Sequence, residues 1–297
     1  MTSLKPVLSA VAVVVASFVA QPAAELPVLT ARSASPTFSM NVWNPAGRVK
    51  VIAWDRDSLV VRGRIDPTQK YFFGGNDAVA KVGVLSAAKL GVESRKPGDD
   101  AKPCDFEIWV PRRAKLSIKT ASADIEGTDI SGSFYTVSGA IRLAGTSTSI
   151  EAETMSGNLD LNANVPWLRA RTGDGHLLLR GQPQDVDAST IAGTLDIATA
   201  TPLRAQFTSV TGDIHYAGSP PSGAILEFSN HNGGVDLLLP PTASGVFAMS
   251  SVSGVIENSV SSVRPAAAPR AMRVTLGRGD ASITVRTFKG TIRLRSR

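Results

Sequence analysis

The chain has 297 residues, of which 43% are hydrophobic and 19% charged, and its formal net charge is +6 at pH 7. Cys104 is the only cysteine, so an internal disulfide is excluded and packing alone must hold the fold; this length is enough for a substantial core, in one long domain or two. We expect Cys104 to be a small buried hydrophobic group at a strand start rather than a nucleophile.

Residues 1–24 have the layout of a secretory signal peptide. Lys5 supplies a short basic region, residues 7–20 form an apolar run, and small residues follow. The run is too short for a comfortable membrane span, although an uncleaved N-terminal anchor is the alternative. No later segment is apolar enough to cross a bilayer. We therefore expect a bacterial protein exported to the periplasm, the outer surface or the medium. The sequence does not fix the position at which the signal peptide is cleaved.

Residues 37–113 are predicted to form an N-terminal β region that follows a short polar stretch. Runs at 38–44, 47–55 and 58–65 each alternate apolar and polar residues. The short turns between these runs predict hairpins that cap the fold. The expected structure then continues with a strand at 71–73, a strand or helix at 79–92, a polar loop at 96–103 and a strand at 105–111.

From residue 114 to residue 297 the chain is predicted to be a domain of β-strand repeats. A phrase of the form Thr-x-Ser-Gly-x-(Ile/Leu)-x-Leu recurs with a spacing of 16 residues and then four times 18 residues. Its threonines are Thr120, Thr136, Thr154, Thr172, Thr190 and Thr208. So short and regular a period indicates one unit that is stacked, with each copy burying its neighbour's apolar face.

Each repeat contains two short strands. Alternation places Ile, Leu and Ala inward and charged residues outward, and the Thr-x-Ser-Gly step is expected to be a corner in which glycine supplies a positive φ. Two strands and two corners account for about eighteen residues, which predicts an all-β fold of the β-solenoid type. An antiparallel meander or sandwich is the alternative, because periodicity does not distinguish parallel coils from hairpins.

The outward residue between the two apolar residues of each repeat forms a predicted surface column. Its candidate binding residues are Arg142, Asp160, Asp196, His215, Asp236 and Glu257, with Leu178 as an apolar member. Neighbours in such a column lie about 4.8 Å apart, so an ion pair between Arg142 and Asp160 is expected. Asp236 and Glu257 would repel each other unless the register slips or a cation bridges them.

The C-terminal end of the chain is strongly basic. Residues 264–297 contain nine basic side chains and only one acidic residue, Asp280. Such an end suits an anionic envelope polymer or lipid surface, or it simply keeps the end of the stack soluble. Candidate contacts to an anionic surface are Arg286, Lys289, Arg293, Arg295 and Arg297. A nucleic-acid partner is not expected, since aromatic-rich RNA-binding phrases are missing.

No catalytic, cofactor or metal site is predicted. His176, His215 and His231 are the only histidines and have no ligand spacing. The acidic residues of the repeats are scattered rather than paired, which favours solvated strand faces over the catalytic carboxylate pair of a polysaccharide-cleaving β-helix. We therefore expect a protein without enzymatic activity.

Three phrases give the chain a resemblance to the bacterial putative-adhesin domain family. They lie at 41–63, 106–132 and 277–294, and they match the opening, the first repeat and the closing phrase of the family. Ala53 departs from the glycine usual in the family, and 66–103 is longer than expected. The resemblance implies an envelope-associated β-solenoid of unknown function and brings no catalytic residues.

Together these observations predict a non-enzymatic exported adhesin or envelope scaffold. Its partner is expected to be an anionic envelope polymer or another envelope protein, and its oligomeric state is open. The alternatives are a carbohydrate-active β-helix enzyme and a periplasmic binding partner of an envelope signalling system.

Overall fold

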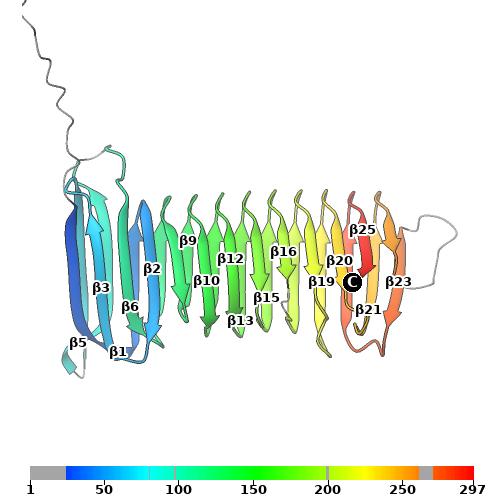
Figure 1. Cartoon of the computed structure of the whole chain (residues 1–297), viewed down its shortest axis with the longest axis horizontal. Coiled ribbons are helices and arrows are strands. Elements are labelled where there is room, and N and C mark those ends of the chain that lie inside the picture. The colour runs from blue at the N-terminus through cyan, green and yellow to red at the C-terminus, as the bar shows by residue number, and fades with distance from the viewer. Residues whose placement is uncertain (1–24, 80, 97, 199–200, 261–269) are drawn as a thin grey trace, which may run out of the picture.

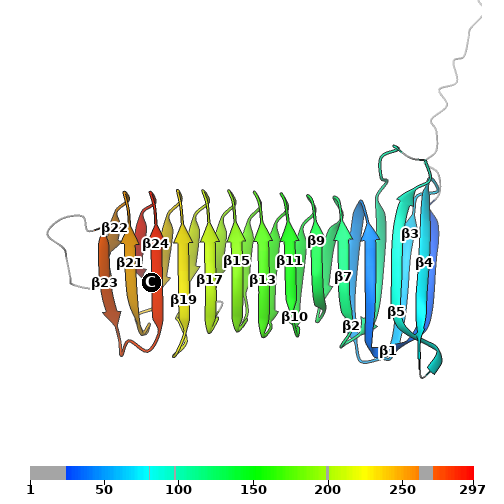
Figure 2. The ribbon, with the colours of Figure 1, turned by 180° about the vertical axis from the view of Figure 1, so that it is seen from behind.

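The computed structural model describes residues 25–79, 81–96, 98–198, 201–260 and 270–297. The predicted leader at 1–24 therefore lies outside the described residues. All the regular structure in these ranges is β-strand, in two long sheets that face each other along the length of the molecule (Figures 1 and 2). Within the same ranges, no helix is long and apolar enough to span a membrane.

The order of strands in each sheet shows how the chain is stacked. Sheet A runs in the order β1 (Leu26–Asn44), β3 (Ser58–Ile65), β6 (Cys104–Pro111), β2 (Gly47–Trp54), β8 (Asp124–Thr128), β10 (Ile141–Thr146), β12 (Leu159–Asn164), β14 (Leu177–Arg180), β16 (Leu195–Ala198), β18 (Ile214–Ala217), β20 (Val235–Leu239), β25 (Ile292–Ser296) and β22 (Ile256–Asn258). Sheet B runs in the order β4 (Gln69–Ala78), β5 (Lys81–Ser94), β1, β7 (Lys115–Thr120), β9 (Ser131–Thr136), β11 (Ile150–Thr154), β13 (Trp167–Thr172), β15 (Asp185–Thr190), β17 (Arg204–Ser209), β19 (Ile225–Asn230), β24 (Ser282–Thr287), β21 (Gly245–Ser251) and β23 (Ala271–Leu276).

The repeats form a parallel β-solenoid, as the period predicts. Each coil contributes one strand to each sheet, and every strand from β7 to β18 pairs in parallel with the strand two places further along the chain. The antiparallel meander is therefore excluded for these coils. Inward residues such as Leu161, Ala170 and Leu179 are fully buried between the sheets, and burial of these side chains is the main stabilising contribution.

The recurring threonine makes the corner that carries the chain out of sheet B. Thr136, Thr154, Thr172 and Thr190 are buried, and each hydroxyl accepts a hydrogen bond of 2.9–3.1 Å from the N–H of the glycine three residues later. The same corner position is filled in other coils by Asn44, Thr120, Ser209, Asn230, Thr287 and Ser251. The phrase repeats because a polar side chain at this position hydrogen-bonds the turning backbone.

The corner glycines are required for space and not for a positive φ. None of Gly157, Gly175 and Gly193 has a positive φ, so that expectation was wrong. A Cβ on any of these three would lie 1.8 Å from the carbonyl oxygen of the corner glycine one coil earlier. Because the backbones of successive coils approach each other so closely, a larger residue would clash with main chain.

The last copy of the phrase is shifted by one residue from its predicted register. Ser209, and not Thr208, is the partner of Thr190, and its hydroxyl donates to the carbonyl of Gly212 at 2.6 Å. Thr208 instead pairs with Ser189 on the outward side of sheet B. This coil has 19 residues between its corner positions, and a threonine one place before the corner conceals the extra residue.

The N-terminal end differs from the predicted run of hairpins. The turn between 38–44 and 47–55 is a solenoid corner, because β1 continues in sheet B alongside β7 while β2 lies in sheet A between β6 and β8. An antiparallel hairpin is formed by β4 and β5, so the strand or helix expected at 79–92 is a strand, over Lys81–Ser94. The polar stretch 30–36 also lies within β1, whose first part pairs with β3.

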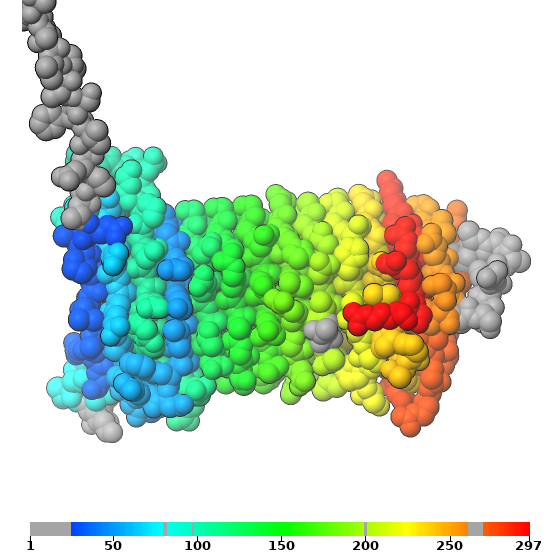
Figure 3. Space-filling view, viewed as in Figure 1, coloured from blue at the N-terminus to red at the C-terminus, as the bar shows by residue number. Residues whose placement is uncertain are grey.

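Both ends of the solenoid contain a coil that is out of chain order. The coil of β1 and β2 lies between the coil of β5 and β6 and that of β7 and β8. The last coil, β24 and β25, lies between β19–β20 and β21–β22 (Figure 3). The outermost strand is antiparallel at three of the four sheet edges, in β1, β4 and β23, whereas the edge strand β22 is parallel to β25.

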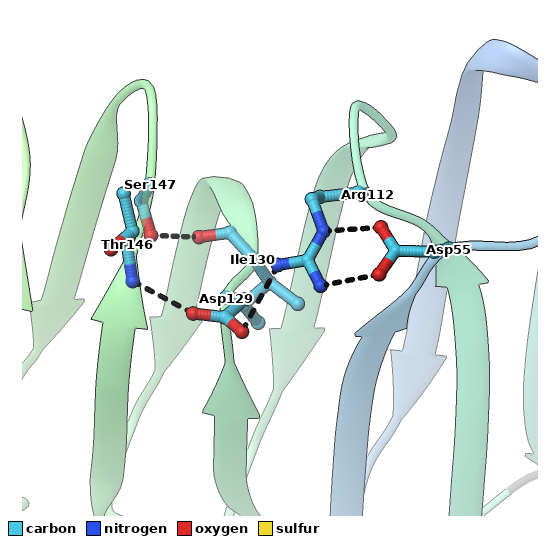
Figure 4. A network of polar contacts seen from close by, with 6 residues as sticks. All are labelled: Asp55, Arg112, Asp129, Ile130, Thr146 and Ser147. Atoms are coloured by element: carbon cyan, nitrogen blue, oxygen red, sulfur yellow. Dashed lines mark hydrogen bonds and ion pairs between the residues drawn. The ribbon is translucent and has the colours of Figure 1, made fainter.

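A polar network joins four neighbouring strands of sheet A where they end (Figure 4). Arg112 donates to both carboxylate oxygens of Asp55, at 2.7 and 3.1 Å, and to Asp129 at 3.2 Å. Asp129, which has a left-handed φ of 57°, also accepts from the N–H of Thr146 at 2.8 Å. The guanidinium of Arg112 lowers the pKa of Asp55. The network therefore links the N-terminal coils to the first repeats.

Candidate functional site

The predicted surface column exists on the outward face of sheet A. Arg142, Asp160, Leu178, Asp196, His215 and Asp236 are successive partners in the register. The row extends beyond Arg142 through Glu126, Lys50, Glu107 and Arg62. Positive and negative side chains alternate over this first half of the row. We call the complete row, from Arg62 to Glu257, the sheet A charge row.

The end of the row contains a residue that the repeat pattern did not reveal. Arg293 lies between Asp236 and Glu257, because β25 is inserted between β20 and β22. Its Nε donates to Glu257 at 3.1 Å, and the neighbouring Arg295 donates to Asp236 at 2.9 Å. The prediction that Asp236 and Glu257 are adjacent was therefore wrong. The repulsion expected between them is relieved because the cationic Arg293 lies between the two acids.

The expected ion pair between Arg142 and Asp160 is absent. Arg142 instead lies 3.0 Å from Asp124 and 3.8 Å from Glu126, the acids of the preceding coil. Asp160 accepts from Arg180 at 2.5 Å. Two carboxylates on one side of Arg142 attract it more strongly than one on the other. Glu126, Arg142, Asp160 and Arg180 are among the residues that line a shallow hollow of about 410 Å³ on sheet A.

His176 and His215 both lie beside Asp196, whereas His231 lies apart from them. His176 Nε2 is 2.6 Å from Asp196 Oδ2, whereas His231 stacks on Phe288 with ring centroids 4.8 Å apart. His215 is in the sheet A charge row between Asp196 and Asp236. In the part of the chain that the structure describes, no three His, Cys, Asp or Glu side chains are grouped to hold a metal ion.

Sheet B also presents ion pairs between successive coils. Arg169 lies 3.5 Å from Glu151 and 3.3 Å from Asp187, and Arg204 lies 2.6 Å from Asp185. All these side chains are partly exposed, so each pair stabilises the fold by only about 0–1 kcal/mol. Their main effect is to fix a regular pattern of charge along both faces.

The five basic C-terminal residues do not form a single patch. Arg293 and Arg295 lie on sheet A and are paired with acids, and the hydrogen bond to Asp236 raises the pKa of Arg295. Arg286 lies on sheet B in β24, Lys289 is in the following turn, and Arg297 ends the chain. Contact between these residues and an anionic surface stays a prediction.

Cys104 is at the start of β6 and is 1% exposed. Burial raises the pKa of its thiol, which disfavours the nucleophilic thiolate. The expectation of a buried hydrophobic role at a strand start is confirmed.

Comparison with known proteins supports the fold. No protein-family model and no curated protein sequence matches the chain. Two crystal structures described as putative adhesins match over most of their length. The one from Parabacteroides distasonis has 10% identity and a TM-score of 0.52, covering 90% of this chain and 96% of that chain. The one from Parabacteroides merdae has 9% identity and a TM-score of 0.52, covering 91% and 96%.

The chain shares the fold of bacterial putative adhesins. A third match, from Parabacteroides distasonis, is described as a putative lipid binding protein, with 10% identity, a TM-score of 0.54 and coverage of 91% of this chain and 97% of that chain. At these identities the likeness concerns the fold alone, and it agrees with the resemblance seen in the sequence.

Proposed function

We propose that the chain is a non-enzymatic adhesin or scaffold of the bacterial envelope, which binds extended partners along the faces of its solenoid. The observation that carries the proposal is the pair of long, flat parallel sheets with fixed outward charges, of which the sheet A charge row is the clearest. Regular rows suit many weak contacts with a repeating partner, whose combined affinity far exceeds that of each contact.

Two further observations support this function. The layout of residues 1–24 is that of an export signal. Solved proteins with the same fold are described as putative adhesins and, in one case, as a putative lipid binding protein. An anionic polymer or another envelope protein is the proposed partner.

The location is tested by fractionating bacteria that express the full chain and by treating intact cells and spheroplasts with protease. We expect the protein in the envelope or the medium. Any periplasmic fraction should resist protease in intact cells and be degraded once the outer membrane is opened in spheroplasts. Retention in the cytosol would contradict the proposal.

The absence of catalysis is tested by incubating residues 25–297 with a panel of polysaccharides. The control is the Asp160→Ala/Asp196→Ala double variant, which alters the sheet A charge row. We expect no products from either protein. Products from the unmodified protein that disappear in the double variant would instead establish a carbohydrate-active enzyme.

A further inference from the structure

A shallow hollow on the outward face of sheet B contains an exposed tryptophan. The hollow measures about 370 Å³ and lies where β5, β1 and β7 run side by side. Trp43 is 38% exposed at its edge, and Lys89 and Lys119 are among the side chains that line it. Buried Val42 and Leu90 close its floor. We call this the Trp43 hollow.

The strand register places the two lysines on opposite sides of the tryptophan. Lys119 is the partner of Trp43 on β7, and Lys89 is the partner of Asn41 on β5. Two strand spacings and a two-residue offset put their backbones about 12 Å apart. On the β5 side, Trp43 faces Gly91, and the ring of Phe72 lies over this glycine. The ring of Phe72 from β4 therefore fills the space beside Trp43 that a β5 side chain would otherwise occupy.

The charge of the Trp43 hollow differs from that of the middle coils. Neither Lys89 nor Lys119 makes an ion pair with any residue that the structure describes, and Lys89 lies 5.6 Å from the centre of the Phe72 ring. The nearest acid on the row of Lys119 is Glu153, two strands away, or about 10 Å in backbone spacing. The lining side chains include two positive charges and no negative charge.

A second tryptophan on the same sheet provides a natural comparison. Trp167 is 42% exposed and borders a hollow of about 410 Å³. This hollow is lined by three acids, Asp185, Asp187 and Glu227, and by one cation, Arg204. The two hollows are thus similar in size and in aromatic exposure but opposite in charge.

These features favour a ring-shaped, hydroxylated and negatively charged ligand. The face of an indole packs against an apolar ring face, while Asn41 and Ser117, which also line the hollow, offer an amide and a hydroxyl to ligand hydroxyl groups. Ammonium groups without ion-pair partners bind carboxylate or sulfate with charge-assisted hydrogen bonds. The closed floor leaves no channel for an acyl chain. We propose that the Trp43 hollow binds an acidic saccharide, stacked on Trp43 between Lys89 and Lys119.

This inference rests on the proposed function, because an envelope protein meets acidic polysaccharides. It is tested with purified residues 25–297 by titration calorimetry at several salt concentrations. The probes are an oligogalacturonate, a sulfated glycosaminoglycan fragment, the methyl-esterified oligogalacturonate as a neutral ring control, and polyglycerol phosphate as a polyanion without sugar rings. We expect saturable binding of at least one acidic saccharide, weaker at high salt, and little binding of either control.

Three variants assign the site. Trp43→Ala and Lys89→Gln/Lys119→Gln should each weaken binding by about tenfold or more, and the lysine variant should also flatten the salt dependence. Trp167→Ala is the matched control and should bind like the unmodified protein. Thermal unfolding of each variant checks that the fold is kept, and the exposed lysines test the site even if Trp43→Ala is poorly folded.

Several outcomes would overturn the inference. These are no saturable binding of either acidic saccharide, equal binding of the esterified probe, unchanged affinity of the folded Trp43→Ala variant, or equal binding of polyglycerol phosphate, which would indicate a general polyanion surface. Affinity of the purified protein does not depend on cell fractionation, so failure here leaves the envelope location intact. Retention in the cytosol, in turn, leaves the measured affinities intact.

Discussion

Replacing Thr172 with valine should destabilise the solenoid from within one corner. The Thr172 hydroxyl accepts from the N–H of Gly175 and donates to the carbonyl of Gly157, both at 3.1 Å, and the residue is only 4% exposed. Valine has nearly the same shape but can make neither bond. Each buried group left without a partner costs about 1–3 kcal/mol, so we expect the free energy of unfolding to fall by about 2–4 kcal/mol.

The measurement is urea unfolding of residues 25–297, followed by circular dichroism. Thr208→Val is the matched control, because Thr208 faces outward on β17 and surface substitutions change stability by about 0.5 kcal/mol or less. Thr172→Ser keeps the hydroxyl and should recover most of the lost stability. The reasoning is refuted if the Thr172→Val and Thr208→Val proteins unfold at the same urea concentration.

Three other predictions address the core, the polar network and the C-terminal coil. Tyr216 is 2% exposed and its hydroxyl has no partner among the described residues, so Tyr216→Phe should raise the unfolding free energy by about 1 kcal/mol. Burial also raises the pKa of Tyr216, so in an absorbance titration its phenol should ionise at a higher pH than that of a free tyrosine. Arg112→Gln should bring the pKa of Asp55 back up toward 3.8 in an NMR titration. In the unmodified protein that pKa is lowered by folding, so its stabilising effect is present above the unfolded pKa and is lost as the pH falls through the folded one. Deleting 281–297 removes β24 and β25, exposes strand edges on β19 and β21, and should produce oligomers in size-exclusion chromatography.

Each of these has a result that would count against it. A Tyr216→Phe protein less stable than the original would imply a partner for the hydroxyl. An Asp55 pKa that does not respond to Arg112→Gln would mean that another group lowers it. A monomeric deletion variant with unchanged cooperativity would show that the inserted coil is dispensable.

The parts of the fold that could be predicted are those in which neighbours in the chain are neighbours in space. From β7 to β20 each coil packs on the next, so the inward apolar residues, the corner threonines up to Thr190 and the order of the sheet A charge row from Arg142 to Asp236 follow from the period. The role of the corner glycines could not be derived this way, because the clash of a Cβ on Gly175 is with the backbone of another coil. The ion pairs of Arg142 could not be derived from the period either. Whether its side chain turns toward Asp124 and Glu126 or toward Asp160 depends on three-dimensional geometry.

The two ends could not be predicted, because their pairings join segments that are distant in the chain. Arg293 enters the sheet A charge row only because β25 returns between β20 and β22. Likewise Lys89 and Lys119 flank Trp43 only because the coil of β1 and β2 is inserted between those of β5–β6 and β7–β8. No local pattern marks such insertions, since each inserted strand has the same alternation as any other.

The same insertions explain why the surface differs between the middle and the N-terminal end. In the middle coils, the outward residues of one coil lie beside the equivalent outward residues of the next coil. Opposite charges such as Arg169 and Asp187 can therefore pair between coils. An inserted coil brings together β5, β1 and β7, whose outward residues do not belong to one repeating pattern. Unmatched cations around an exposed indole arise there, and a ligand can supply the missing charge. If the Trp43 hollow binds as proposed, it adds a specific saccharide site to the weaker contacts proposed along the faces of the middle coils.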